Sequence, residues 1–197
     1  YLDGVQIGSG ATNHPLAQEN GDIYIGVNFW QDMIFRGLVD DVKVYNTTAT
    51  AEEIQKDYLR DIGDMEGFKV ASYSFEDGLV NAEGAETDTA SAVVTGLGSY
   101  NGEVAYDEDG FKGSAVRLGD YGLKLNKENL GENFSVSMWL NSDSTFPENQ
   151  VLMFLGYHDP QKWIAVSGGE PGNGNSSLVK FWGKDDSVYT SYTTLST

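Results

Sequence analysis

The chain contains no cysteine among its 197 residues, so disulfide bonds and thiolate metal sites are excluded. Proline is scarce, with four residues, and only two histidines occur. Cationic residues are also few, because 12 Lys and Arg stand against 30 Asp and Glu, for a net charge of −18 at pH 7. Nucleic acids and anionic membrane surfaces bind cationic faces, so we expect neither as a partner. No apolar run approaches the roughly 20 residues of a membrane-spanning helix, and membrane insertion is not expected.

Glycine, by contrast, is abundant at 24 residues, and aromatic residues make up 12% of the chain. Short runs rich in Tyr, Phe and Val, separated by glycine-containing turns, are typical of all-β proteins. Only one stretch differs: Thr50 and Glu53 form a capping box, and Ile54 and Tyr58 follow at helical spacing. The sequence therefore predicts an all-β, two-sheet antiparallel sandwich with one short helix near residues 50–60.

Two stretches of the chain carry motifs that belong to opposite ends of a domain. The first is a Phe-x-Gly-x-Val-Asp-Asp-Val-Lys-Val-Tyr strand at residues 35–45, followed by Thr-Ala-Glu-Glu-Ile at residues 50–54. The second comprises Tyr-Ser-Phe-Glu-Asp-Gly at residues 73–78, Gly-Ser-Ala-Val-Arg-Leu at residues 113–118 and Phe-Ser-Val-Ser-Met-Trp-Leu at residues 134–140. These motifs resemble, respectively, the closing and the opening segments of laminin G-like (concanavalin A-like) jelly-roll domains.

The closing segment comes first in this chain, which reverses the order of that family. We expect residues 1–62 to be the carboxyl-terminal segment of one jelly roll, residues 63–67 a linker, and residues 68–197 the amino-terminal segment of another. Three arrangements follow: one permuted sandwich, which we favour; parts of two tandem domains; or tails that complete the heads of neighbouring chains by domain swapping. All three meet one physical need, because half of a sandwich exposes an apolar sheet face and open edges.

Asp40 is the most informative carboxylate of the chain. It shares strand parity with Val42 and Val44, so we expect it to point inward, where a carboxylate must be paired or bind a metal. The resemblance implies a structural Ca²⁺ between this strand and the opening strand, which ends in Glu76 and Asp77. Oxygen ligands at loop ends suit Ca²⁺, so Asp40, Glu76 and Asp77 are the predicted metal ligands. The alternative is that Asp40 caps a loop by hydrogen bonding.

A catalytic site finds little support in the sequence. Glycoside hydrolysis needs two carboxylates flanking the bond, and the Glu-x-Asp-x-x-Glu strand of glycosidases with the related sandwich fold is absent. No serine stands in a Gly-x-Ser-x-Gly nucleophile turn. We therefore expect that the protein is not an enzyme.

Aromatic residues near loops favour a binding role, because sugar rings present apolar C–H faces to aromatic side chains and hydroxyls to polar ones. The candidate ligand-binding residues, any of which can instead belong to the core, are Trp30, Tyr157, His158, Trp163 and Trp182. The expected function is a non-catalytic carbohydrate-binding or adhesion accessory module of a secreted bacterial glycan-active enzyme or surface protein. A structural spacer or protein-interaction domain without a glycan ligand is the alternative. The expected partner is a glycan or an extracellular protein, and the expected location is extracellular, secreted or attached to the cell wall.

Overall fold

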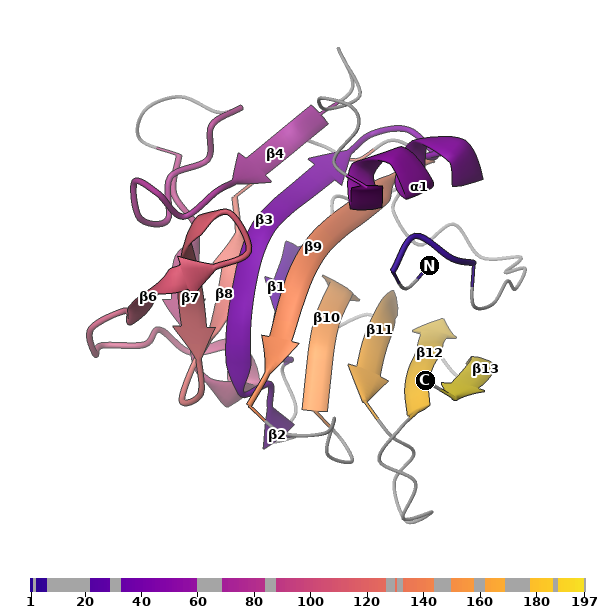
Figure 1. Ribbon diagram of the computed structural model, residues 1–197. Coiled ribbons are helices and arrows are strands. Elements are labelled where there is room, and N and C mark those ends of the chain that lie inside the picture. The colour runs from indigo at the N-terminus through magenta and orange to yellow at the C-terminus, as the bar shows by residue number, and fades with distance from the viewer. Residues whose placement is uncertain are drawn as a thin grey trace.

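The strands form two antiparallel sheets in the computed structural model of the chain (Figure 1). The structure describes residues 1, 3–6, 22–28, 33–59, 69–83, 88–126, 130, 133–143, 150–157, 162–168, 178–185 and 188–196. Within the strands, the backbone but not the side chain is described for residues 33, 157, 162, 163, 168 and 178–196.

The larger sheet has eight strands. They are β1 (Asp22–Ile25), β2 (Met33–Ile34), β5 (Ser91–Val93), β8 (Gly122–Leu125), β10 (Gln150–Tyr157), β11 (Lys162–Gly168), β12 (Leu178–Asp185) and β13 (Val188–Ser196). Their order is β13-β12-β11-β10-β1-β8-β5, and β2 pairs with β10 beside this path. Every pairing is antiparallel except that of β2 with β10.

The smaller sheet has five strands: β3 (Gly37–Tyr45), β4 (Lys69–Tyr73), β6 (Tyr106–Gly110), β7 (Gly113–Leu118) and β9 (Ser135–Ser142). Its central strand is β3, which pairs with β9 along one edge and with β4 and β7 along the other. The helix α1 (Ala51–Leu59) follows β3, and a short 3-10 turn, η1, spans Thr95–Leu97. No helix in the described ranges has the length and apolar character needed to cross a membrane.

The core lies between the two sheets, because alternate side chains of each strand face the opposite layer. Its buried members include Ile23, Ile25, Leu123, Leu125 and Leu155 from the larger sheet and Val39, Val42, Val44, Val116 and Leu118 from the smaller one. A second cluster, which includes Tyr24 and Phe154, covers the other face of the larger sheet. The predicted two-sheet antiparallel sandwich with one short helix is confirmed, and it is consistent with a jelly roll.

Candidate functional site

Strand β3 contains a bulge that changes the expected direction of Asp40. Asp41 has a positive φ of 47°, and the register with β9 shifts next to Asp40. Val39 faces the core before the bulge and Val42 faces it afterwards, because one extra residue reverses the alternation. The prediction that the side chain of Asp40 points inward, on the same face of the strand as Val42, is therefore wrong. Asp40 lies on the outer face of the smaller sheet, paired with Trp139 of β9.

Asp40 is nevertheless only 2% exposed, because the turn between β6 and β7 covers it. Its Oδ1 accepts a hydrogen bond from the N–H of Asp41 at 2.6 Å, and its Oδ2 accepts one from the N–H of Lys112 at 2.8 Å. Burial raises the pKa of Asp40, the two hydrogen bonds lower it, and repulsion from Asp41 and Glu76 raises it, so that the pKa lies above its ordinary value. These hydrogen bonds are the ones expected of a loop cap.

Glu76 reaches the same turn from the loop that follows β4. Its Oε1 accepts a hydrogen bond from the N–H of Ser114 at 2.9 Å. Gly113 has a left-handed φ of 84°, and a Cβ at this position would overlap the Glu76 carboxylate. Asp77 is exposed beside it. Asp40 and Glu76 thus converge on one turn, but no group of three or more Asp, Glu, His or Cys side chains suited to a metal occurs among the residues that the structure describes.

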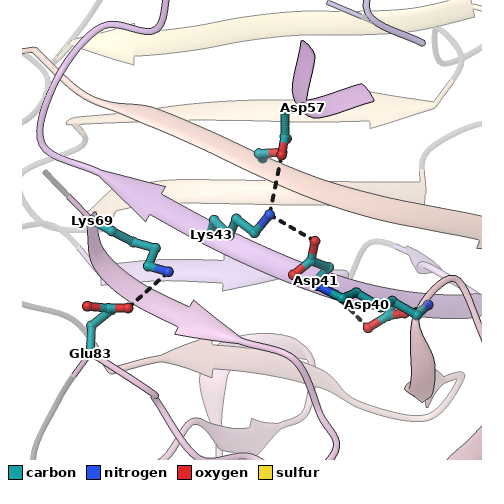
Figure 2. A network of polar contacts seen from close by, with 8 residues as sticks. Asp40, Asp41, Lys43, Asp57, Lys69 and Glu83 are labelled. Atoms are coloured by element: carbon teal, nitrogen blue, oxygen red, sulfur yellow. Dashed lines mark hydrogen bonds and ion pairs between the residues drawn. The ribbon is translucent and has the colours of Figure 1, made fainter. Parts of the chain in front are cut away.

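Lys43 forms the centre of a polar network between β3 and α1 (Figure 2). Its Nζ lies 2.9 Å from Asp41 Oδ2 and 3.3 Å from Asp57 Oδ1. The hydroxyl of Ser137 in β9 donates a hydrogen bond to Asp57 Oδ2 at 2.9 Å. Burial lowers the pKa of Lys43, but the hydrogen bond and charge of Asp41 and the charge of Asp57 outweigh it, so the pKa lies above its ordinary value. The network therefore holds α1 on the outer face of the sheet.

The helix begins as its sequence predicts. The N–H of Thr50 donates a hydrogen bond to Glu53 Oε2 at 2.7 Å, and the N–H of Glu53 donates one to Thr50 Oγ1 at 3.2 Å. This reciprocal pair is the predicted capping box. The hydrogen bonds of Thr50 also lower the pKa of Glu53. Local sequence therefore sets the start of α1, whereas the network of Lys43 sets where the helix packs.

A row of stacked aromatic rings lies next to this network. Trp139 stacks on Phe111 of the β6–β7 turn with ring centroids 3.4 Å apart, and on Tyr58 of α1 with centroids 5.8 Å apart. Gly4 packs against Tyr58, where a Cβ would lie 3.1 Å from the Tyr58 Cβ. Trp139 thus stacks with aromatic rings of the helix and of the hairpin turn and joins both to the sheet.

An exposed apolar patch lies at the same end of α1. It consists of Tyr1, Val5, Tyr58 and Leu59, which are 48%, 60%, 38% and 55% exposed. Figure 1 shows the first residues of the chain close to α1, in agreement with the packing of Gly4 on Tyr58. Exposed apolar side chains that gather on neighbouring segments are typical of interaction surfaces.

The predicted ligand-binding residues lie largely outside the described side chains. Trp30 and His158 are outside the described residues altogether. The backbones of Tyr157, Trp163 and Trp182 belong to β10, β11 and β12, three neighbouring strands of the larger sheet. Trp163 pairs with Gly156 and Lys184, and Trp182 pairs with Ala165. The two tryptophans thus occupy adjacent strands, two register positions apart.

Lys43 and Asp57 were missing from the sequence-based set of candidates. The available signal was Lys43 itself, a cation that stands between Val42 and Val44 on a strand that precedes an acidic helix. Its partner Asp57 lies fourteen residues away in a different element, and local patterns do not specify such a pairing.

Comparison with known proteins gives one match. Residues 1–55 match the laminin G family model of the concanavalin A-like lectin/glucanases superfamily. No curated protein and no solved structure matches the chain. The matched range includes β1, β3 and the start of α1, but ends before the turn that Asp40 caps. The resemblance carried by residues 35–45 and 50–54 is thus confirmed, and the amino-terminal segment is similar to concanavalin A-like lectins and glucanases, a family that suggests a carbohydrate- or protein-binding module.

Proposed function

We propose that the protein is a non-catalytic carbohydrate-binding or adhesion accessory module of a secreted bacterial glycan-active enzyme or surface protein. The match of residues 1–55 to a family of lectins and glucanases carries this proposal. The net charge of −18 is compatible with it, since a neutral glycan requires no cationic face. In this proposal the protein acts outside the cell.

Three strand carboxylates are paired with cations, which supports binding rather than hydrolysis. Asp22 lies 2.8 Å from Lys124, Asp107 lies 2.7 Å from Arg117, and Asp41 is held by Lys43. A glycosidase needs two carboxylates that face the scissile bond from about 5–10 Å apart. Incubation with a panel of polysaccharides should release no reducing sugar above the buffer blank. Release that scales with protein concentration would overturn the non-catalytic proposal.

A glycan array in calcium-containing buffer tests the ligand class. We expect binding to neutral glycans, because aromatic side chains recognise sugar faces. Trp163→Ala and Trp182→Ala should each reduce binding at least tenfold, which corresponds to about 1.4 kcal/mol. Tyr1→Ala removes an exposed aromatic residue elsewhere and serves as the control. Binding no higher than background for the unmodified protein would contradict the proposal.

Calcium at the Asp40–Glu76 turn is part of the same proposal. Both carboxylates are oxygen donors. Burial and, to a smaller extent, repulsion from Asp41 and Glu76 raise the pKa of Asp40, and a cation beside the carboxylate would offset that repulsion. Asp40 and Glu76 would hold the ion with backbone carbonyls, and Asp77 would have to join them from an exposed position. A metal that binds the folded state must stabilise it by mass action. Calcium should therefore raise the melting temperature and chelator should lower it, whereas an unchanged melting temperature in both would contradict a site here.

The exposed apolar patch favours a second candidate, a protein-interaction domain without a glycan ligand. Three of its members, Val5, Tyr58 and Leu59, are large apolar side chains of two segments that meet at α1. Under this candidate the glycan array shows no binding above background, and Leu59→Glu weakens attachment to a protein ligand. Unchanged attachment of Leu59→Glu to the protein ligand would contradict this second candidate.

A further inference from the structure

The strands of residues 1–62 pair only with strands of residues 68–197 in the described part of the chain. β1 pairs with β8 and β10, and β2 pairs with β10. β3 pairs with β4, β7 and β9. No described pairing joins β1, β2 and β3 to one another. The amino-terminal segment thus supplies strands to both sheets without forming a sheet of its own.

The carboxyl-terminal segment has pairings of its own but lacks the strand that joins them. In the larger sheet, β10 to β13 form one group and β5 and β8 form another, and β1 lies between these groups. In the smaller sheet, β3 lies between β9 on one edge and β4 and β7 on the other. Residues 68–197 therefore present two slots, each one strand wide. Two central strands are needed to close both sheets.

The strands in these slots are among the most buried parts of the protein. Ile23 and Ile25 of β1 and Val42 and Val44 of β3 are fully inaccessible to solvent. Without them, the acceptor strands would expose apolar faces and unpaired backbone N–H and C=O groups. Pairing of β1 and β3 with these acceptor strands is therefore strongly favoured over leaving the slots empty.

Contacts on the outer face hold the same segment in place. The N–H of Ala49 donates a hydrogen bond to Ser135 Oγ at 2.8 Å, and Ser135 donates one to the carbonyl of Thr47 at 2.8 Å. Asp57 accepts a hydrogen bond from Ser137, and the turn at Lys112 is capped by Asp40. These contacts are non-covalent, and one stretch of backbone, residues 63–67, is the covalent link between the segments.

We propose that residues 68–197 form an acceptor that takes residues 1–62 from a second copy of the chain as well as from its own. A second copy carries the same strands and can make the same pairings and outer-face contacts, which is the condition for domain swapping. The tethered segment has a high effective concentration, so self-filling dominates in dilute solution. Refolding at high protein concentration increases filling by a second copy. This inference does not depend on any glycan or metal.

Cleavage of the linker tests the acceptor. A protease recognition sequence is inserted after Gly63 of the full chain, and the cleaved protein is analysed by size-exclusion chromatography in native buffer. We expect both pieces to elute together with the circular dichroism spectrum of the uncleaved insertion variant, and to separate only in denaturant. Separate elution in native buffer would overturn the proposal, because the pairings across the two slots would then not hold the segment.

Joint refolding tests exchange between copies. Tagged and untagged full chains are unfolded, mixed, refolded together at low and at high concentration, and captured through the tag. We expect captured untagged chain to increase with the refolding concentration, and to be absent when the two chains are refolded separately before mixing. Equal capture in both procedures would indicate association of folded chains and overturn the proposal. Absence of capture after joint refolding at high concentration would overturn it as well.

Discussion

Replacement of Lys43 by methionine tests the ion-pair network under α1, because methionine keeps most of the apolar stem and removes the charge. The side chain of Lys43 is 11% exposed, and those of Asp41 and Asp57 are 13% and 29% exposed. Loss of one member of a fully buried ion pair costs about 3–5 kcal/mol, whereas an exposed pair contributes about 0.2–1 kcal/mol. Since both carboxylates keep some contact with water, we expect Lys43→Met to lower the free energy of unfolding by about 2–3 kcal/mol.

Urea unfolding followed by circular dichroism measures this change at constant m-value. Lys56→Met is the control, since Lys56 is a lysine of α1 that pairs with Glu52 on the helix surface, at 44% and 78% side-chain exposure. The control should cost less than about 0.5 kcal/mol. The pKa of Lys43 is raised, so its contribution is complete below the unfolded value of 10.5 and is lost only as pH rises through the folded pKa. If Lys43→Met costs no more than Lys56→Met at neutral pH, the reasoning is refuted.

Three further predictions concern single positions. Gly122→Ala places a Cβ 2.5 Å from the carbonyl oxygen of Ile25 and should lower the free energy of unfolding in urea by about 1–3 kcal/mol. In the control Gly119→Ala the new Cβ has no atom within 4 Å, so stability should change by less than about 0.5 kcal/mol. Equal costs of the two substitutions would contradict this prediction. The pKa of Asp40 is raised in the folded state, so the contribution of Asp40 to stability should fall as pH rises from 3.8 through the folded pKa in calcium-free buffer. Asp40→Asn should flatten this dependence, and an unchanged slope in urea unfolding at several pH values would count against it. Tyr58→Leu should cost about 0.5–1.5 kcal/mol by the same assay through lost stacking on Trp139, and no loss would show that the stack is energetically neutral.

The elements that local sequence determines could be predicted. The capping box of Thr50 and Glu53 marked the start of α1, and the structure forms both of its hydrogen bonds. The alternation of side chains along residues 134–140 predicts Val136 and Met138 on one face of the strand and Ser137 on the other. Val136 and Met138 pack on the core, and Ser137 bonds to the helix outside it. Alternation and capping need only neighbouring residues, which is why they can be read from one sequence.

The direction of Asp40 could not be predicted from alternation alone. A regular strand requires an even spacing between core residues, but Val39 and Val42 are three positions apart. That odd spacing signals an extra residue, and the structure accommodates it with the positive φ of Asp41. The position of Lys43 relative to Asp57 depends on how α1 packs, which is a long-range property. The site's polar geometry therefore arises from one local irregularity and one tertiary contact.

The turn capped by Asp40 lies where the two segments meet, and this links the proposed cation to the proposed exchange. Asp40 belongs to residues 1–62, whereas Glu76 and the N–H groups of Lys112 and Ser114 belong to residues 68–197. A cation shared by Asp40 and Glu76 would therefore bind only when the donor segment fills its slot. By linkage, such a cation at 100 times its Kd would stabilise the filled state by about 2.7 kcal/mol. Because a second copy rebuilds the same site, the cation would slow the exchange of segments without favouring either source of the donor.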